Sequence, residues 1–385
     1  MSRTLLVAAA LLTGFSAASL PARAAPDELA RLNAQIMNDP RNIELNLAYA
    51  RAAEAEGDYG KALGAYERVQ QYDPGNAEAK SGALRAAAKL LPNTFEVFSE
   101  IGAGYESNPE NFANGGKGQA VGFARFLLKD ERTIGDTRWR TTALFAGNLY
   151  SSDSDLNYGY AGAASGPVYA VTPTMTLHPS LGIGGAYFDH HYFYTEAFAT
   201  ALFEGGEGPM NYIVRYRVGY RDYNDFFPST HGGFADVTAK LLFPAVIAKD
   251  DLFVFSPWWR WSGIGAVGDI NFLISPDDFR TGRYNEIGAR LEYFKPVTDW
   301  VTAGINFSAL KRYYAQATDD TVFPPTTTDR RDYIYAPGFS LIFRNPYVTN
   351  QSSVRFDYRY ERDDSNVPLG SYTNNIATLT FYNRY

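Results

Sequence analysis

The sequence predicts an all-β transmembrane antiparallel barrel of about 14 strands, preceded by a short N-terminal α-helical domain of the tetratricopeptide type. Three observations predict this fold. The N-terminus resembles an export signal, an Ala- and Glu-rich stretch follows it, and apolar or aromatic residues alternate with polar ones from residue 94 onward. In extended strands such alternation produces two faces, one suited to lipid and one suited to water.

Residues 1–24 have the pattern of a signal peptide. Arg3 precedes the apolar run 5–12, and Ala22-Arg23-Ala24 supplies a small-x-small cleavage pattern. The run is too short to span a membrane as a helix. The sequence contains no Cys, which excludes a cysteine-linked lipid anchor, disulfides and thiolate metal ligation. We therefore expect an exported chain.

Composition narrows the class of the exported protein. Mean hydropathy is −0.27, and no stretch after the signal is apolar enough for a spanning helix. Aromatic residues make up 15% of the chain, which suits a barrel whose aromatic side chains lie at the membrane–water interfaces. The net charge of −7 argues against nucleic acid as a partner, whereas outer-membrane lipids fit a Tyr-rich barrel.

Residues 25–90 are rich in helix-forming residues and predict a periplasmic helical domain. Two turn signals, 39–42 and 73–76, are offset by 34 residues, the period of the tetratricopeptide repeat. We expect helices at 27–37 and 77–90 on either side of one full repeat. The small, turn and aromatic positions that would pack this repeat are Ala50, Gly57, Tyr59, Ala62, Tyr66 and Pro74. Such a domain either docks another protein or merely spaces the barrel.

Residues 94–385 predict the barrel. Every second connection is short, as at 171–174, 248–250 and 297–299, although the one between the second and third strands is longer. The intervening connections are longer and more polar, which predicts periplasmic turns alternating with external loops. The strands expected from the alternation are 94–106, 119–130, 137–151, 157–171, 175–188, 194–204, 210–223, 233–247, 251–263, 282–296, 299–313, 330–344, 350–362 and 371–385.

Charged residues concentrate on one face of these strands. In 212–221, Tyr and Val alternate with Arg, and a charge at the bilayer midplane costs about 2–4 kcal/mol, so the arginines should face a wet lumen. These inner charges either tie neighbouring strands together or line a translocation path. The residues predicted to face the lumen are Arg215, Arg217, Arg221, Arg290, Arg355, Arg359, Glu96 and Glu100.

The last strand carries a predicted insertion signal. Leu379, Phe381 and Tyr385 alternate toward an aromatic C-terminus, as in barrels that the bacterial barrel-assembly machinery inserts. Asn383 departs from that pattern, which usually has an apolar or aromatic residue there. We therefore expect the assembly machinery as a partner.

Catalytic chemistry has little support in the sequence. His178-Pro179-Ser180 resembles the His-x-Ser of an outer-membrane phospholipase, but it follows a predicted periplasmic turn, whereas that enzyme acts at the outer side. Asp189-His190-His191 is better explained as a solvated loop than as a metal site, because adjacent strand-end residues diverge. We expect no enzyme activity, no cofactor and no metal.

Two local stretches, Gly102–Asn108 and Asp364-Ser365-Asn366, resemble the barrel domain of the surface lipoprotein assembly modifier family, whose architecture also joins tetratricopeptide repeats to a C-terminal barrel. The resemblance implies an outer-membrane translocon of type XI secretion that moves a lipoprotein or a secreted ligand-scavenging protein to the cell surface. The helical part here is shorter than the family's usual array. An outer-membrane porin or exopolysaccharide export channel, and an adhesive surface protein, remain alternatives.

Overall fold

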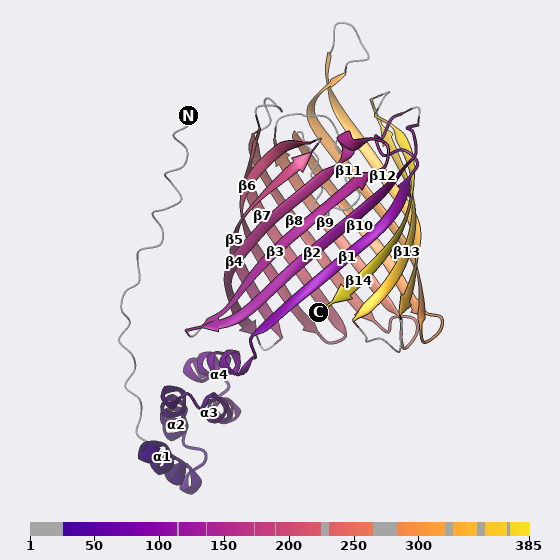
Figure 1. The fold of residues 1–385 in the computed structure, drawn as a ribbon. Helices are drawn as coiled ribbons and strands as arrows, with labels where there is room; N and C mark the ends of the chain where they lie inside the picture. Colours follow the sequence, from indigo (N-terminus) through magenta and orange to yellow (C-terminus); the bar gives the residue numbers. More distant parts are fainter. Residues whose placement is uncertain are drawn as a thin grey trace, which may run out of the picture. The chain divides into compact units, whose positions relative to one another are not determined.

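The computed structural model describes residues 26–385 except 114, 136, 173, 189, 225–230, 265–282, 320–325, 345–350 and 368–369. The predicted signal peptide lies outside the described residues. The chain divides into two compact units, and the division falls between Leu91 and Pro92. The first unit contains helices and the second contains strands (Figure 1).

The helical unit has the helices that the sequence predicts. Each of α2, α3 and α4 begins at a side-chain cap, because Asn42, Asp58 and Asn76 accept hydrogen bonds from backbone N–H groups of the first turn. Gly57 ends α2 with a φ of 81°, a left-handed conformation that favours glycine. The helices are α1 (Pro26–Asn38), α2 (Ile43–Glu56), α3 (Tyr59–Tyr72) and α4 (Ala77–Leu90).

Small residues and one tyrosine form the core of this unit. Ala50 and Ala62 are fully buried, so α2 and α3 approach closely, and Tyr66 is buried beside them. Tyr66 donates a hydrogen bond to Glu54 at 2.8 Å. A Cβ atom at Gly82 would lie 2.3 Å from the Tyr66 ring, so α4 needs glycine at this position. Tyr59 packs at the edge of the core as the first residue of α3, and Pro74 lies in the turn between α3 and α4.

The second unit is a closed antiparallel barrel, as the sequence predicts. In the part of the chain that the structure describes, fourteen strands pair each with the next, and β14 pairs with β1 to close the sheet (Figure 1). The strands are β1 (Thr94–Glu106), β2 (Gln119–Ile134), β3 (Thr137–Tyr150), β4 (Tyr158–Thr172), β5 (Met175–Phe188), β6 (His191–Glu207), β7 (Met210–Tyr223), β8 (Gly232–Pro244), β9 (Leu252–Gly263), β10 (Arg283–Pro296), β11 (Val301–Asp319), β12 (Thr326–Arg344), β13 (Ser352–Ser365) and β14 (Tyr372–Arg384).

Three strands extend beyond their sequence-based boundaries in an informative way. β2 runs on to Ile134, so the longer connection expected before β3 is wrong. The charged residues at the end of β2 stay in the strand, where they are paired on both faces: Arg132 contacts Asp130 at 2.9 Å, and Lys129 contacts Glu131 at 3.1 Å. β11 and β12 likewise extend further than expected and form a long hairpin (Figure 1).

The two ends of the barrel differ. The short connections, including those after β2, β4 and β6, lie at one end together with the start of β1 and the end of β14, which we call the short-turn end. Most connections at the opposite, long-loop end are longer, such as 107–118 and 151–157, which contains the 3-10 helix η1 (Ser154–Leu156). The connection between β5 and β6, at this end, is an exception because β5 ends at Phe188 and β6 begins at His191. None of the described helices is both long enough and apolar enough to cross a membrane.

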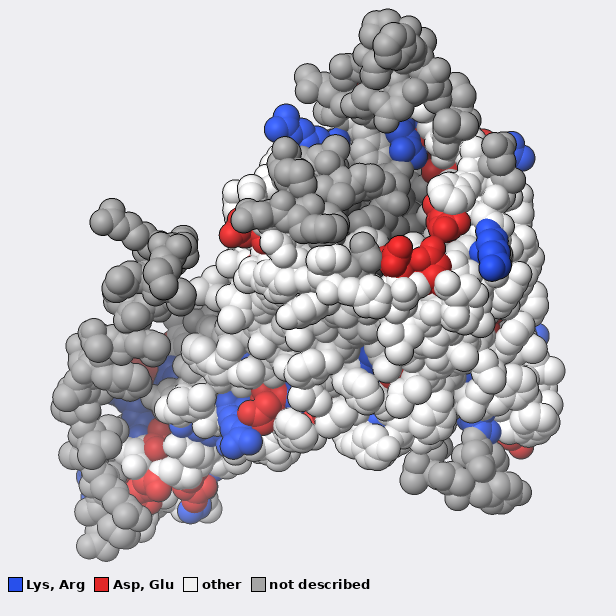
Figure 2. Space-filling model, turned by 45° about the horizontal axis from the view of Figure 1, so that its top comes forward, with Lys and Arg blue, Asp and Glu red and all other residues white. Residues whose placement is uncertain are grey.

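The outer face of the barrel is apolar. Exposed large apolar or aromatic side chains project from alternate positions of successive strands, such as Leu181 and Ile183 on β5 and Tyr216 and Val218 on β7. In the space-filling view most of the described barrel wall carries no charged residue, and charges show mainly toward its edges (Figure 2). An apolar band between charged edges is typical of a barrel that crosses a bilayer.

Candidate functional site

The inner face is identified by contacts between strands that are not neighbours. Arg140 on β3 reaches Glu204 on β6 at 2.6 Å, and Tyr160 on β4 donates to Glu196 on β6 at 2.8 Å. Such contacts cross the concave side of a closed sheet. All the residues predicted to face the lumen lie on this inner face, among them the β7 series Arg215, Arg217 and Arg221.

A row of alternating charges crosses β7 to β12 on this face. Each member lies directly opposite the next one in the register of neighbouring strands, so every arginine of the row lies opposite at least one carboxylate. Opposite charges facing each other across strands stabilise a sheet, because each guanidinium satisfies its neighbours' oxygens. We call this row the charged belt: Arg217, Asp236, Arg260, Glu286, Arg312 and Asp332.

Two inner glutamates, Glu286 in the belt and Glu196 beside it, each accept hydrogen bonds from several side chains. Glu196 is fully buried and accepts from Arg217 and from Arg221 Nε at 2.9 Å, while the Arg217 guanidinium lies 4.2 Å from the Phe198 ring centre. Glu286 accepts from Arg312 Nε at 2.8 Å and from other donors on β9. Paired and stacked in this way, these groups fill the barrel interior locally and hold its wall together.

A cavity of about 430 Å³ lies near the middle of the strands on either side of the closing seam between β1 and β14. Four arginines and three carboxylates line it, so its wall is polar with one positive charge in excess. We call it the central cavity. The described residues that line it are Glu100, Phe123, Arg125, Arg290, Glu292, Asn306, Arg355, Asp357, Tyr358, Arg359, Ile376, Thr378, Thr380 and Tyr382.

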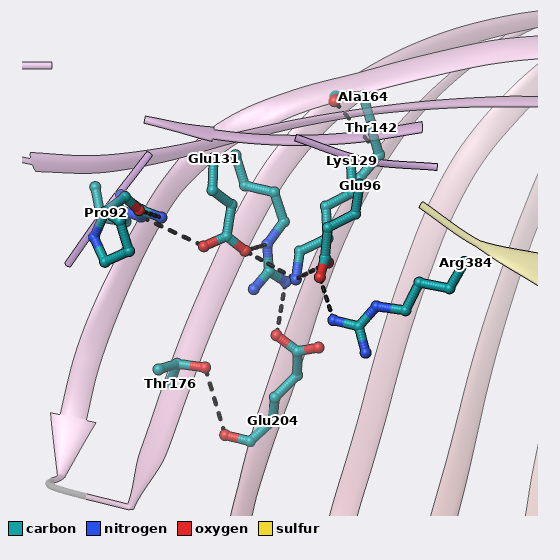
Figure 3. Close-up of polar contacts among 11 residues, drawn as sticks. Pro92, Glu96, Lys129, Glu131, Thr142, Ala164, Thr176, Glu204 and Arg384 are labelled. Carbon is teal, nitrogen blue, oxygen red and sulfur yellow. Dashed lines mark hydrogen bonds and ion pairs between the residues drawn. The ribbon is translucent and has the colours of Figure 1, made fainter. Parts of the chain in front are cut away.

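A second ion-pair network lies toward the short-turn end (Figure 3). Glu131 accepts from Arg140 Nε at 2.6 Å and from Arg138 Nε at 3.3 Å. Glu96 on β1 pairs with Arg384 on β14, so an ion pair joins the first and last strands at the closing seam. Because Arg140 on β3 also contacts Glu204 on β6, the network joins strands that are not paired through their backbones.

The predicted insertion-signal residues lie on the opposite face. Leu379, Phe381 and Tyr385 are exposed and alternate on the outer side of the C-terminal strand region. Asn383 shares their side, but it accepts a hydrogen bond from Ser352 and is buried. That contact explains locally why a polar residue is tolerated where an apolar one was expected.

The residues considered for catalysis are not arranged as a catalytic pair. Ser180 Oγ lies 2.5 Å from Thr200 Oγ1, and His178 Nε2 is buried without a hydrogen-bond partner. A nucleophile has to contact its base, and this serine contacts another hydroxyl instead. Within the described residues no group of three or more His, Asp or Glu side chains is placed to hold a metal ion, and Asp189 lies outside those residues.

Sequence reasoning missed several inner carboxylates. Glu196, Asp236 and Asp332 occupy inner positions in strands whose ranges were predicted, and each contacts one or more arginines. Their signal was present, because each falls on the polar side of a two-residue alternation. Which arginine each one meets depends on the register between strands, which the alternation does not contain.

The closed barrel, its apolar outer face and its charged interior define a transmembrane β-barrel of the outer-membrane type. No protein-family model matches the chain, and no curated protein matches it. Among solved structures, the outer membrane channel DcaP of Acinetobacter baumannii is similar over 76% of this chain and 97% of its own, with 10% identity and a TM-score of 0.43.

Two further solved barrels show the same degree of similarity. OccAB3 of Acinetobacter baumannii covers 76% of this chain and 99% of its own, with 9% identity and a TM-score of 0.37. OpdK of Pseudomonas aeruginosa, solved with vanillate, covers 76% and 99%, with 8% identity and a TM-score of 0.37. The sequence identities and TM-scores are low, so the function of this barrel has to be inferred from its own side chains.

Proposed function

We propose that the protein is a selective outer-membrane channel that lets small polar solutes cross through its lumen. The observation that supports this most is the central cavity, because charged side chains from both sides of the closing seam surround about 430 Å³ of space near the middle of the strands. Barrels that conduct solutes have a polar, water-filled interior, and unfilled space lined by charged side chains at this level is what such a path needs.

The lumen is narrower than that of a general porin. Fourteen strands enclose less space than the sixteen to eighteen of open porins, and the charged belt occupies part of the interior. Solutes therefore have to pass close to fixed charges. Such a channel selects by charge and size and conducts less than an open porin.

The test is electrical recording from the purified full-length protein in a planar lipid bilayer. We expect a steady current in KCl with small unitary steps, and uptake of small charged solutes by proteoliposomes. A membrane that contains folded protein, verified by heat-modifiable migration on gels, and yet carries no current and takes up no solute would refute the channel. Sucrose uptake serves as the neutral comparison.

A second candidate is a translocon for a protein client, as the resemblance to surface lipoprotein assembly modifiers implies. The observation that favours it is the helical unit, whose α2, α3 and α4 pack around Tyr66 with the spacing of a tetratricopeptide repeat. In this proposal the helices lie in the periplasm and recruit the client. Deleting residues 26–90 should then remove one protein from the cell surface, which surface proteomics detects, while the barrel still inserts.

A comparison of the wild-type strain with a strain that lacks the gene distinguishes the two candidate functions. Loss of the whole gene should reduce uptake of a charged solute if the protein is a channel, and should strand a client in the periplasm if it is a translocon. An unchanged surface proteome together with reduced uptake would reject the client, and the opposite result would reject the channel.

A further inference from the structure

We propose that Arg290, Arg355 and Arg359 form an oxyanion-binding site in the central cavity, which takes a small solute carrying a carboxylate or phosphate group. The site rests on the proposed channel function and gives that channel its substrate class. β10 supplies Arg290, and β13 supplies the other two arginines.

These arginines differ from those of the charged belt in what faces them across the strands. Belt arginines lie opposite carboxylates, which explains them as ties between strands. The cavity arginines have uncharged neighbours in both adjacent strands. Those neighbours are Ser256 and Ser308 beside Arg290, Ile342 and Thr380 beside Arg355, and Gly338 and Ile376 beside Arg359. Strand pairing therefore gives no reason for three positive charges here.

Arg290 also lies close enough to the other two positive charges to interact unfavourably with each of them. Glu292 and Asp357 offset part of the charge of Arg290 and Arg355, and Glu361 offsets part of that of Arg359. Like charges gathered in a partly desolvated cavity raise the free energy of the empty barrel. An anion between them lowers it, so the cluster attracts negative solutes.

Hydrogen-bond donors exceed acceptors in the same place. Each guanidinium has five N–H donors. Arg290 meets one carboxylate, Glu292 at 3.1 Å, and Arg359 meets one, Glu361 at 3.3 Å. The Nε atoms of both arginines, and that of Arg125 across the cavity, are buried without a partner. An oxyanion, which is acceptor-only and fits the guanidinium fork, supplies what these donors lack.

The rest of the cavity sets the size and polarity of the solute. Hydroxyl-bearing Thr378, Thr380 and Tyr382 on β14 line the wall together with Glu100 on β1. They can hydrogen-bond the polar remainder of a solute, and the Glu100 carboxylate, 3.7 Å from Arg125, disfavours a solute whose second end is also anionic on that side. About 430 Å³ accommodates a small organic acid or phosphate ester.

The test is equilibrium dialysis of radiolabelled lactate, which has one carboxylate and a polar remainder, and of inorganic phosphate against the detergent-solubilised full-length barrel, with and without KCl. The variants are Arg290→Gln and Arg359→Gln, and Arg215→Gln is the matched control. Arg215 is also an inner arginine that contacts a carboxylate, Asp236 at 3.1 Å, and its side chain is 28% exposed against 31% for Arg290 and 33% for Arg359. It does not line the central cavity among the described residues.

We expect the wild type and the Arg215 variant to bind at least one probe and both cavity variants to bind it about tenfold more weakly, since each loses one charged hydrogen-bonding group. Arg359→Lys should bind with intermediate strength, because it keeps the charge and loses the planar fork. Gel mobility checks that every variant is folded.

Absence of binding to the wild type, or equal weakening by the Arg215 control, would overturn the site. Reversal potentials in a KCl gradient give the second readout: the wild type should favour chloride over potassium, and both cavity variants should lose much of that preference. Binding without any conductance would refute the channel but leave the site standing. Conductance without probe binding would refute the site alone.

Discussion

At the residue scale, the inner arginines fall into two groups that the bare sequence does not separate. Belt arginines such as Arg312 are buried and bonded to carboxylates of neighbouring strands. Cavity arginines are partly exposed and lie opposite uncharged residues, and Arg290 and Arg359 each contact one carboxylate. The first group stabilises the wall, and the second leaves charge available to a solute.

Replacing one arginine of each group by methionine should show the difference. Arg312→Met leaves Glu286 buried with a partner lost, so the free energy of unfolding should fall by about 3–5 kcal/mol. Arg359→Met should change it by less than about 1 kcal/mol, because that group is a third exposed. Urea unfolding in detergent, followed by gel mobility, measures both. Equal losses would show that the two groups are not distinct.

A pair of glycines in the helical unit offers a second test at this scale. Gly82→Ala places a Cβ 2.3 Å from the Tyr66 ring, so it should lower the stability of the helices by about 1–3 kcal/mol. Gly64→Ala, in the middle of α3, meets nothing within 4 Å and should raise it by about 0.5–1 kcal/mol. Thermal melting of the helical circular dichroism signal in the full-length protein compares them. A destabilising Gly64→Ala would contradict the packing described here.

At the element scale, strands were easier to foresee than the contacts that join them. A two-residue alternation persists along each strand because one face meets lipid and the other meets water, so strands such as 94–106 and 175–188 coincide with β1 and β5. The residues at which strands begin and end are harder to predict from this alternation. Charged residues beyond the predicted end of a strand, such as Arg132, can remain in the strand when they pair with a neighbour, here Asp130.

One short turn depends on a single carboxylate. Asp251, between β8 and β9, accepts backbone hydrogen bonds from Val246, Ile247 and Ala248 at 2.6–2.9 Å. Burial raises the pKa of this carboxyl, but these donors and the Tyr293 hydroxyl outweigh it and hold the pKa below its usual range. The turn is therefore stabilised by the ionised form.

The sign of the pH effect follows from that lowered pKa. The contribution of Asp251 is fully present above the unfolded pKa of about 3.9 and is lost as the pH falls through the folded value. Asp251→Asn should lower the unfolding midpoint in urea at neutral pH. The gap between wild type and variant should shrink toward about pH 3. A gap that widens on acidification would contradict the assignment.

At the scale of the whole molecule, the two ends of the barrel predict its orientation. Short turns and both barrel termini share one end, and barrels of this type keep short turns in the periplasm. Because the chain has no native Cys, single cysteines report cleanly. A cysteine at exposed Ser152, at the long-loop end, should react with a membrane-impermeant maleimide on intact cells, and one at exposed Lys249 should react only after the outer membrane is opened. The reverse labelling would show that the barrel has the opposite orientation in the membrane.

Local patterns in the sequence were enough to predict the class of fold, the helical and barrel regions, the order of strands in an up-and-down barrel and the face of the arginines. They were enough because the alternation and the helical turn signals are local and repeat along the chain. Which charges meet depends on the pairing of the strands in three dimensions. The register sets Glu286 between Arg260 and Arg312, yet leaves Arg290 opposite serines, since a slip along either neighbouring strand would change those partners without altering the pattern in one strand. Closure of β14 on β1 then brings Arg355 and Glu100, far apart in sequence, to the wall of one cavity.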